Sequence, residues 1–347
     1  MFKELLSWSD DQHSHLIWRR ERSLYMTLVS EIMLQQTTVS TVSNHIEKFL
    51  KKYPDLETLS ATTEEEVCIA WKGLGYYRRA RNLLNAAKDI KTKHGGEIPT
   101  TISELKEIKG IGDYTANAIV GIGANLRALA VDANLERVIA RFYGIETLKG
   151  PKLQKEIYTR FYDKEILPQI RKGNSRKINE AFMDLGRVIC QARKADCVLC
   201  PIKKNCVAFK ENTVLSIPNK PQKKEVKFEL DLVRVIVSKK NQIIGYVKSD
   251  KEWLQGQVEL PTFVIRSEDK SLKQYPKTKN KFDLKNMKSY KTSITKYKIN
   301  NYILEVNQRE FKKLFTDLKS YNYFLNNDQE TNFSTATIKA LKLCKGI

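Results

Sequence analysis

Apolar residues recur every three or four positions through much of residues 1–212, and Pro, Gly and Asp residues interrupt the pattern. This spacing is that of helices with one buried face, and the interruptions mark turns between them. The first part of the chain is therefore predicted to be mainly α-helical. Helices are expected over Leu24–Leu34, Val39–Leu50, Glu64–Trp71, Arg78–Ile90, Ala116–Ile122 and Leu135–Tyr143.

The pattern changes at residues 213–226, where Pro218 and Pro221 stand in a stretch without apolar periodicity. Such a stretch is typical of a linker. Beyond it, alternating and β-branched residues at 226–238, 242–248 and 289–306 predict strands, and residues 310–318 and 334–343 predict helices. Residues 227–347 are therefore predicted to form a smaller α+β domain.

The charge of the chain favours a polyanionic partner. Lys and Arg number 61 against 40 Asp and Glu, for a net charge of +21. Basic residues that neutralise phosphates release counterions, which makes nucleic acid the expected partner. A basic solubility surface or a lysine-rich composition is the alternative. The N-terminus lacks the apolar core of a signal peptide, and no apolar run approaches the ~18 residues of a membrane span. We expect a soluble cytoplasmic protein, monomeric and without membrane contact.

Four of the six cysteines stand close together in the sequence, as Cys190, Cys197, Cys200 and Cys206. Such clustering in a reducing compartment indicates metal binding rather than a disulfide framework. Four thiolates suit either zinc or an iron–sulfur cluster, so the ligands alone do not decide between them.

The segment Leu105–Ala116 predicts a helix, a tight turn and a second helix. Gly110 and Gly112 permit an unusual backbone and a close approach to a partner. Free amides at the start of the second helix, next to Lys109, could bind a phosphate oxygen. An ordinary helical hairpin is the alternative for this motif alone.

Downstream of the hairpin lies Val131-Asp132-Ala133-Asn134. Hairpin, aspartate and cysteine loop together resemble the helix-hairpin-helix glycosylases of the endonuclease III and MutY families. The resemblance implies that the cysteines hold [4Fe–4S], that Asp132 faces the target sugar and that Asn134 assists. Asp132 could also cap the helix that follows it.

Several positions resemble the adenine DNA glycosylase (MutY) family in particular. The lysine of bifunctional lyases is replaced by Tyr114, which implies a monofunctional enzyme that uses water. Glu31, in Ser30–Thr37, matches the family's general acid. The resemblance implies DNA contacts from residues of three motifs: Leu34, Gln36 and Thr37; Tyr76 and Arg78, with Arg79 and Arg81 as further phosphate contacts; and Lys109, Gly110 and Gly112.

The resemblance therefore implies a mainly α helix-hairpin-helix glycosylase fold with an iron–sulfur loop, followed by a Nudix-like α+β domain. The expected function is hydrolysis of adenine mispaired with 8-oxoguanine or guanine in double-stranded DNA. Trp253–Pro261 resembles the Nudix-like turn, without a complete Nudix hydrolysis motif.

Two departures keep other functions open. The family's Phe-Ser-His loop, which senses the mismatch, is replaced at Thr295 and Lys296, and Ala133 stands where glycine is usual. With this alanine, the motif resembles that of glycosylases that remove thymine or uracil opposite guanine. A DNA-damage-binding protein without catalytic activity is a further alternative, although it would not need two placed carboxylates.

Overall fold

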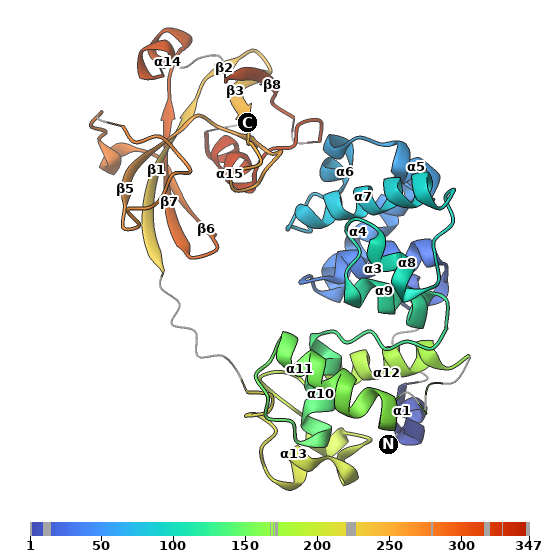
Figure 1. Ribbon diagram of the computed structural model, residues 1–347. Coiled ribbons are helices and arrows are strands. Elements are labelled where there is room, and N and C mark those ends of the chain that lie inside the picture. The colour runs from blue at the N-terminus through green and yellow to red at the C-terminus, as the bar shows by residue number, and fades with distance from the viewer. Residues whose placement is uncertain are drawn as a thin grey trace. The chain divides into compact units, whose positions relative to one another are not determined.

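The computed structural model describes residues 2–9, 15–166, 168, 170, 173–219, 227–278, 280–315, 320–327 and 329–344. Part of the predicted linker, residues 220–226, lies outside these ranges. The chain divides into two compact units, Met1–Gln222 and Lys223–Ile347, which Figure 1 shows as a helical body and a body rich in strands.

Helices build the described part of the first unit. Its α-helices are α1 (Phe2–Ser9), α2 (Ile17–Arg20), α3 (Leu24–Leu34), α4 (Val39–Lys52), α5 (Leu56–Ala61), α6 (Glu64–Ala70), α7 (Arg78–Lys93), α8 (Ile102–Glu107), α9 (Asp113–Ala118), α10 (Ala133–Tyr143), α11 (Pro151–Glu156), α12 (Ser175–Val188) and α13 (Val207–Lys210). Two π-helical segments, Ile119–Gly123 and Ile157–Ile166, follow α9 and α11 directly.

The described part of the first unit has two large hydrophobic cores and a small third one, in which Ala118, Ile122 and Ala130 pack against Tyr114 and Met183. One large core draws on residues between Met26 and Ala128, and the other on Leu5 and residues between Leu129 and Ile217. Helices α3 and α9 thus belong to one core, whereas α10 and α12 belong to the other. The chain passes from the first core to the second just before α10, so the start of α10 lies where the cores meet.

The helices begin where the sequence supplies capping side chains. The Ser23 side chain accepts a hydrogen bond from the Met26 amide at the start of α3, and Thr63 and Glu66 form a reciprocal capping box at α6. Such caps satisfy amides that have no partner within the helix. Helix α3 is buried along most of its length, Glu31 included, because helices of the same core surround it.

The described part of the second unit combines two sheets with two α-helices. One sheet has the order β5-β1-β7-β6, in which β1 and β7 are parallel and the other neighbours antiparallel. In the other sheet, β3 pairs with β2, β4 and β8. The elements are β1 (Phe228–Ile236), β2 (Ser238–Lys239), β3 (Gln242–Val247), β4 (Val258–Glu259), β5 (Thr262–Ser267), β6 (Ser289–Ile294), β7 (Tyr297–Glu305), β8 (Asn322–Leu325), α14 (Gln308–Leu314) and α15 (Thr335–Cys344).

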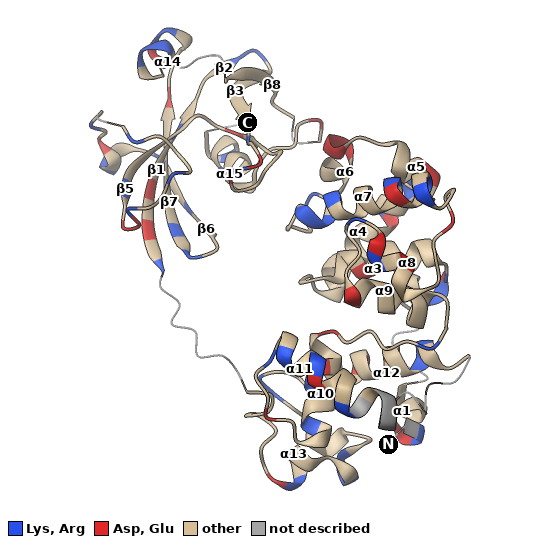
Figure 2. Ribbon diagram, in the orientation of Figure 1, with Lys and Arg blue, Asp and Glu red and all other residues tan. Residues whose placement is uncertain are grey.

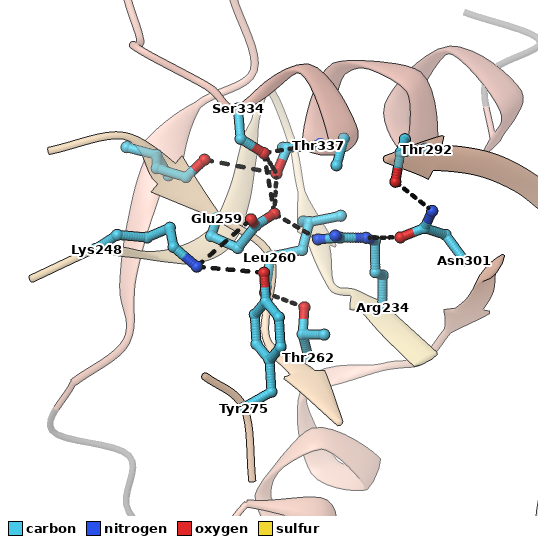
Figure 3. A network of polar contacts seen from close by, with 12 residues as sticks. Arg234, Lys248, Glu259, Leu260, Thr262, Tyr275, Thr292, Asn301, Ser334 and Thr337 are labelled. Atoms are coloured by element: carbon cyan, nitrogen blue, oxygen red, sulfur yellow. Dashed lines mark hydrogen bonds and ion pairs between the residues drawn. The ribbon is translucent and has the colours of Figure 1, made fainter. Parts of the chain in front are cut away.

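A buried polar network joins the two sheets of this unit to α15 (Figure 3). Arg234 of β1 donates to Glu259 of β4 at 2.5 Å and to Asn301 of β7 at 2.7 Å. Ser334 and Thr337, at the start of α15, also donate to Glu259. Burial alone would raise the pKa of Glu259, but Arg234 and Lys248 outweigh it and hold the pKa below its usual value. The buried charge of Glu259 is therefore stabilised by Arg234 and Lys248.

Lys and Arg are spread over both units and alternate with Asp and Glu (Figure 2). In the described ranges, no helix is both long enough and apolar enough to cross a bilayer.

Candidate active site

Glu31 and Tyr114 meet inside the first unit. Glu31 lies in the last turns of α3 and is 6% exposed, and Tyr114 lies in the first turn of α9. The Tyr114 hydroxyl donates a short hydrogen bond to Oε2 of Glu31. This contact leaves Oε1 as the oxygen that can present a proton to a ligand.

The surroundings of Glu31 favour its neutral form. Burial, opposed by the hydrogen bond from Tyr114, raises the pKa of Glu31 to about 7. The nearby Asp132 and Glu180 carboxylates raise this pKa further, while Arg19 lowers it. A carboxylic acid with such a pKa holds its proton near neutral pH and can still release it, as a general acid requires.

Asp132 is the N-cap of α10. Its Oδ1 accepts hydrogen bonds from the amides of Asn134 at 2.9 Å and Leu135 at 2.7 Å, and its Oδ2 accepts one from the Asn134 side chain at 2.7 Å. Burial raises the pKa of Asp132 above its usual value, although these hydrogen bonds favour the charged form. Asp132 can therefore cap α10 and also face the target sugar. The cap holds the carboxylate in place, and because the carboxylate is partly buried its charge is poorly solvated.

A chain of hydrogen bonds runs from Asp132 to the cysteine loop. Arg137 donates to Oδ1 of Asn134 at 2.9 Å and to the carbonyls of Gly186 and Cys190, each at 2.6 Å. A Cβ on Gly186 would lie 2.6 Å from that of Asn134, so α12 packs closely against the start of α10. The position of Asn134 therefore depends on the segment that carries Cys190.

The four clustered cysteines line one pocket. Arg141, Lys203 and the apolar Ile189, Phe209 and Val214 complete its wall. Arg141 donates to the sulfur of Cys190 at 3.2 Å, and burial raises the pKa of Cys200 to about 11. Among the described residues, no three His, Cys, Asp or Glu side chains form a group that could hold one metal ion. The pocket nevertheless has all four cysteines in its lining, beside one arginine and one lysine.

Two charged residues that act on Glu31, Arg19 and Glu180, were not predicted from the sequence. Arg19, in α2, contacts Asp184 at 2.9 Å and Glu180 at 3.4 Å, both on α12. Arg22 forms a further ion pair with Glu180 at 2.6 Å. The sequence gives one signal for Glu180, which is an acidic residue between the apolar Ile178 and the apolar pair Ala181 and Phe182. No local pattern marks Arg19, because its acidic partners lie far along the chain.

The turn after α3 presents predicted DNA-contacting residues to solvent. Gln36 is exposed with φ of 55°, whereas Leu34 and Thr37 are partly buried. The turn after α6 presents Tyr76, which is 64% exposed with φ of 47°, and Arg78 is exposed beside it. The exposed residues of the two turns are therefore available to a ligand.

Arg79, unlike the exposed residues of these two turns, is buried. It is 6% exposed, and its guanidinium donates to backbone carbonyls inside the protein. The expectation that Arg79 contacts phosphate is wrong, because its donors are already used inside the protein. Arg81 is half-buried and lies 3.7 Å from Glu64.

The predicted hairpin joins α8 to α9. Gly110 has φ of 98°, and a Cβ there would lie 2.5 Å from the Asn82 carbonyl oxygen, so this glycine is required sterically. Gly112 is exposed and begins α9, and Lys109 is also exposed. The Lys109 amide donates to Asp89 at 2.9 Å, which ties the turn to α7.

In the second unit, Thr295 and Lys296 form the turn between β6 and β7. Thr295 has φ of 48°, and Lys296 lies 3.0 Å from Asp269 and over the ring of Phe228 at 4.6 Å. The hydrogen bond to Asp269 raises the pKa of Lys296. The turn is therefore held in place by its lysine.

The fold and this constellation agree with comparisons to known proteins. Residues 29–164 match the family described as "HhH-GPD superfamily base excision DNA repair protein". A thermostable thymine-DNA glycosylase structure has a TM-score of 0.53 and 27% identity, over 60% of this chain and 94% of that one. A non-covalent endonuclease III–DNA complex has a TM-score of 0.50 over the same shares, and its 24% identity supports the fold alone. The first unit thus has the fold of helix-hairpin-helix DNA glycosylases.

Relatives found by sequence show which DNA glycosylases this chain resembles. The adenine DNA glycosylase of Buchnera aphidicola subsp. Baizongia pistaciae is 31% identical over 95% of this chain and 92% of its own length. The human adenine DNA glycosylase is 35% identical over 59% of this chain and 38% of its own length. The chain belongs to the adenine DNA glycosylase family, and it is an enzyme of base excision repair that acts on adenine in DNA.

Proposed function

We propose that the chain hydrolyses the N-glycosidic bond of adenine mispaired with 8-oxoguanine or guanine, with Glu31 as general acid and Asp132 as electrostatic stabiliser. The observation that carries this proposal is the pair of carboxylates in unlike surroundings. Glu31 is buried against Tyr114 with a pKa of about 7, and Asp132 accepts three hydrogen bonds at a helix start. When the environments of two carboxyl groups give them different pKa values, one group can act as an acid while the other stabilises positive charge.

Glycosidic cleavage needs both groups. Adenine leaves more readily once its N7 is protonated, and Oε1 of Glu31 can supply that proton. As the bond breaks, positive charge develops on C1′ and O4′ of the sugar. The poorly solvated carboxylate of Asp132 can stabilise this charge more strongly than a carboxylate in water could. Water then attacks C1′, because Tyr114 offers no amine that could form a Schiff base.

Access to adenine requires the base to leave the helix stack. In this proposal, Leu34 at the end of α3, Gln36 in the turn after it and Tyr76 in the turn after α6 would contact the base stack. Arg78 and the turn of Lys109, Gly110 and Gly112 would contact phosphates. A mispaired base costs less to extrude than a paired one. Stacking on an aromatic ring such as Tyr76 contributes ~1–3 kcal/mol per base in single-stranded complexes.

We propose that Cys190, Cys197, Cys200 and Cys206 would hold a [4Fe–4S] cluster. The four cysteines line one pocket, and Arg141 beside Cys190 can offset the negative charge of thiolate ligands. When bound, the cluster would cross-link the loop, and it supplies no step of the hydrolysis. Arg193, Lys194, Lys203 and Lys204 of this loop would then face the DNA backbone from fixed positions.

We assign the glycosylase domain to residues 1–212, the linker to 213–226 and a Nudix-like domain to 227–347. The second unit would inspect the base opposite adenine through the turn of Thr295 and Lys296. A hydroxyl and an ammonium group can donate hydrogen bonds to the oxidised guanine edge.

The test uses the purified full chain on duplexes that contain A:8-oxoguanine, A:G, T:G, U:G or A:T, followed by cleavage of abasic sites with alkali. We expect strand cleavage at adenine opposite 8-oxoguanine and guanine, and strongly slowed cleavage by Asp132→Asn. Cleavage at T:G or U:G without cleavage at adenine would instead support removal of pyrimidines. Mismatch binding without cleavage of any duplex would support a damage-binding role.

A further inference from the structure

Arg79 makes an unusual set of contacts in the first turn of α7. Nη1 donates to the carbonyls of Ile32, Met33 and Gln35, and Nη2 donates to those of Leu74 and Gly75. The first three carbonyls lie at the end of α3, where helix carbonyls lack partners within the helix. One guanidinium therefore caps α3 and binds the loop that precedes α7.

These carbonyls flank the two turns that present Gln36 and Tyr76. Both turns contain a residue with positive φ, 55° at Gln36 and 47° at Tyr76, a conformation that L-residues adopt only when their surroundings hold it. The Arg79 amide also donates to the Tyr76 carbonyl at 2.8 Å. Arg79 thus bonds to backbone next to each strained residue.

Two aromatic rings complete the arrangement. The Arg79 guanidinium lies 5.6 Å from the ring centroids of both Trp71 and Tyr76, within the range of cation–π attraction. Trp71 is fully buried, and its indole donates to the Gly75 carbonyl at 3.2 Å. The exposed ring of Tyr76 therefore has a buried cation beneath it and a fixed loop before it.

We propose that Arg79 is a positioning residue that sets the spacing between the Gln36 turn and the Tyr76 turn, so that both engage the mismatched pair at once. This role rests on the proposed function of those turns and assigns Arg79 no contact with DNA. Its physical basis is the planar guanidinium fork, whose two terminal nitrogens reach the two turns separately. A lysine ammonium keeps the charge, but it cannot span both sets of carbonyls.

The test compares Arg79→Lys with the wild-type full chain. The matched control is Arg160→Lys, because Arg160 is exposed and pairs with Glu156 by an ordinary surface ion pair. Dissociation constants are measured for an A:8-oxoguanine duplex and for a fully paired duplex of the same sequence, together with thermal unfolding. Wild-type adenine excision on the same duplex tests the proposed function independently.

We expect Arg79→Lys to reduce the preference for the mismatched over the paired duplex by about tenfold or more, because small displacements of contacting groups are costly. Affinity for the paired duplex should stay unchanged in Arg79→Lys, and both affinities should stay unchanged in Arg160→Lys. An Arg79→Lys protein with full mismatch preference overturns the proposal. An equal loss of affinity for both duplexes also overturns it, since that result indicates general unfolding or a phosphate contact.

A second variant keeps the proposal testable if Arg79→Lys does not fold. Gly75, just before Tyr76, has φ of 69°, which an alanine adopts only with strain. Gly75→Ala therefore strains the Tyr76 turn without a steric clash, because an added Cβ meets no atom within 4 Å. This variant should show the same selective loss of mismatch preference with Arg79 in place. Full preference in a folded Gly75→Ala protein contradicts the idea that the spacing of the turns matters.

Discussion

Single residues in this protein acquire their chemistry from burial. Glu31 has an ordinary side chain on a helix, yet burial raises its pKa from 4.5 to about 7. Because the folded state binds this proton more tightly than the unfolded state does, Glu31 contributes stability below pH 4.5. That stability is lost as the pH rises towards about 7. Near pH 7 this residue therefore contributes less to stability than at low pH, and this is the consequence of burying Glu31 so that it stays protonated.

The rate of adenine excision should follow the protonation of Glu31. Under single-turnover conditions with saturating enzyme, we expect the rate to fall as the pH rises above about 7, since the acid form is then depleted. Glu31→Gln should lower the rate by about 10²–10⁴-fold and remove this dependence. A wild-type rate that stays level to pH 9, or a Gln variant of normal rate, counts against the assignment.

The roles of Glu31, Asp132 and Tyr114 could be proposed from sequence because short motifs mark them. The Tyr114–Glu31 hydrogen bond could not, since it joins residues of two helices that meet only in the folded chain. Arg79 shows the opposite error. Its position among Arg78 and Arg81 predicts a phosphate contact, but its depth in the fold is not visible in a local pattern.

At the scale of elements, the sequence predicts several segments with one apolar face, although α12 and β5 were not predicted. Helix α3 begins and ends at the predicted Leu24 and Leu34, and α7 begins at the predicted Arg78. Strands β6 and β7 pair within the predicted 289–306 segment. The short β4 and β8 were not predicted, because a strand of two to four residues has too few positions to show a period.

The turn between α8 and α9 gives a prediction for an element. Gly110→Ala should destabilise the first unit by about 1–3 kcal/mol, because the added Cβ meets the Asn82 carbonyl oxygen and the backbone has positive φ. Gly112→Ala is the matched control, since a Cβ there meets no atom within 4 Å and φ is −100°. Urea denaturation of the two variants measures the difference, and equal midpoints would exclude the steric explanation.

At the scale of the whole molecule, each of the two compact units has its own stabilising centre. The described part of the first unit has two large apolar cores and a small one, whereas the second unit depends in part on the buried Arg234–Glu259 pair. Burying an ion pair costs solvation, and removing one partner leaves an uncompensated charge. Sequence reasoning could not find this pair, because its residues are contributed by β1 and β4 and neither stands out locally.

Glu259→Ala should therefore destabilise the second unit by about 3–5 kcal/mol. Hydrogen exchange at peptides of β1 and β7 in the full chain measures the effect, and peptides of α3 and α7 should be unaffected. Glu305→Ala is the control, because its ion pair with Lys288 is half-exposed and contributes about 0–1 kcal/mol. Equal exchange in the two variants would show that the buried pair is not a stabilising centre.

Asp132→Asn tests the central claim most directly, namely that a placed carboxylate stabilises the sugar cation. Adenine release from an A:8-oxoguanine duplex is measured in a single turnover, with the dissociation constant of the same duplex as the second readout. Asparagine retains an oxygen that can cap α10 but removes the charge. We predict a loss of about 10²–10³-fold in the rate with unchanged affinity for the duplex. An Asp132→Asn enzyme that releases adenine at the wild-type rate would contradict the account.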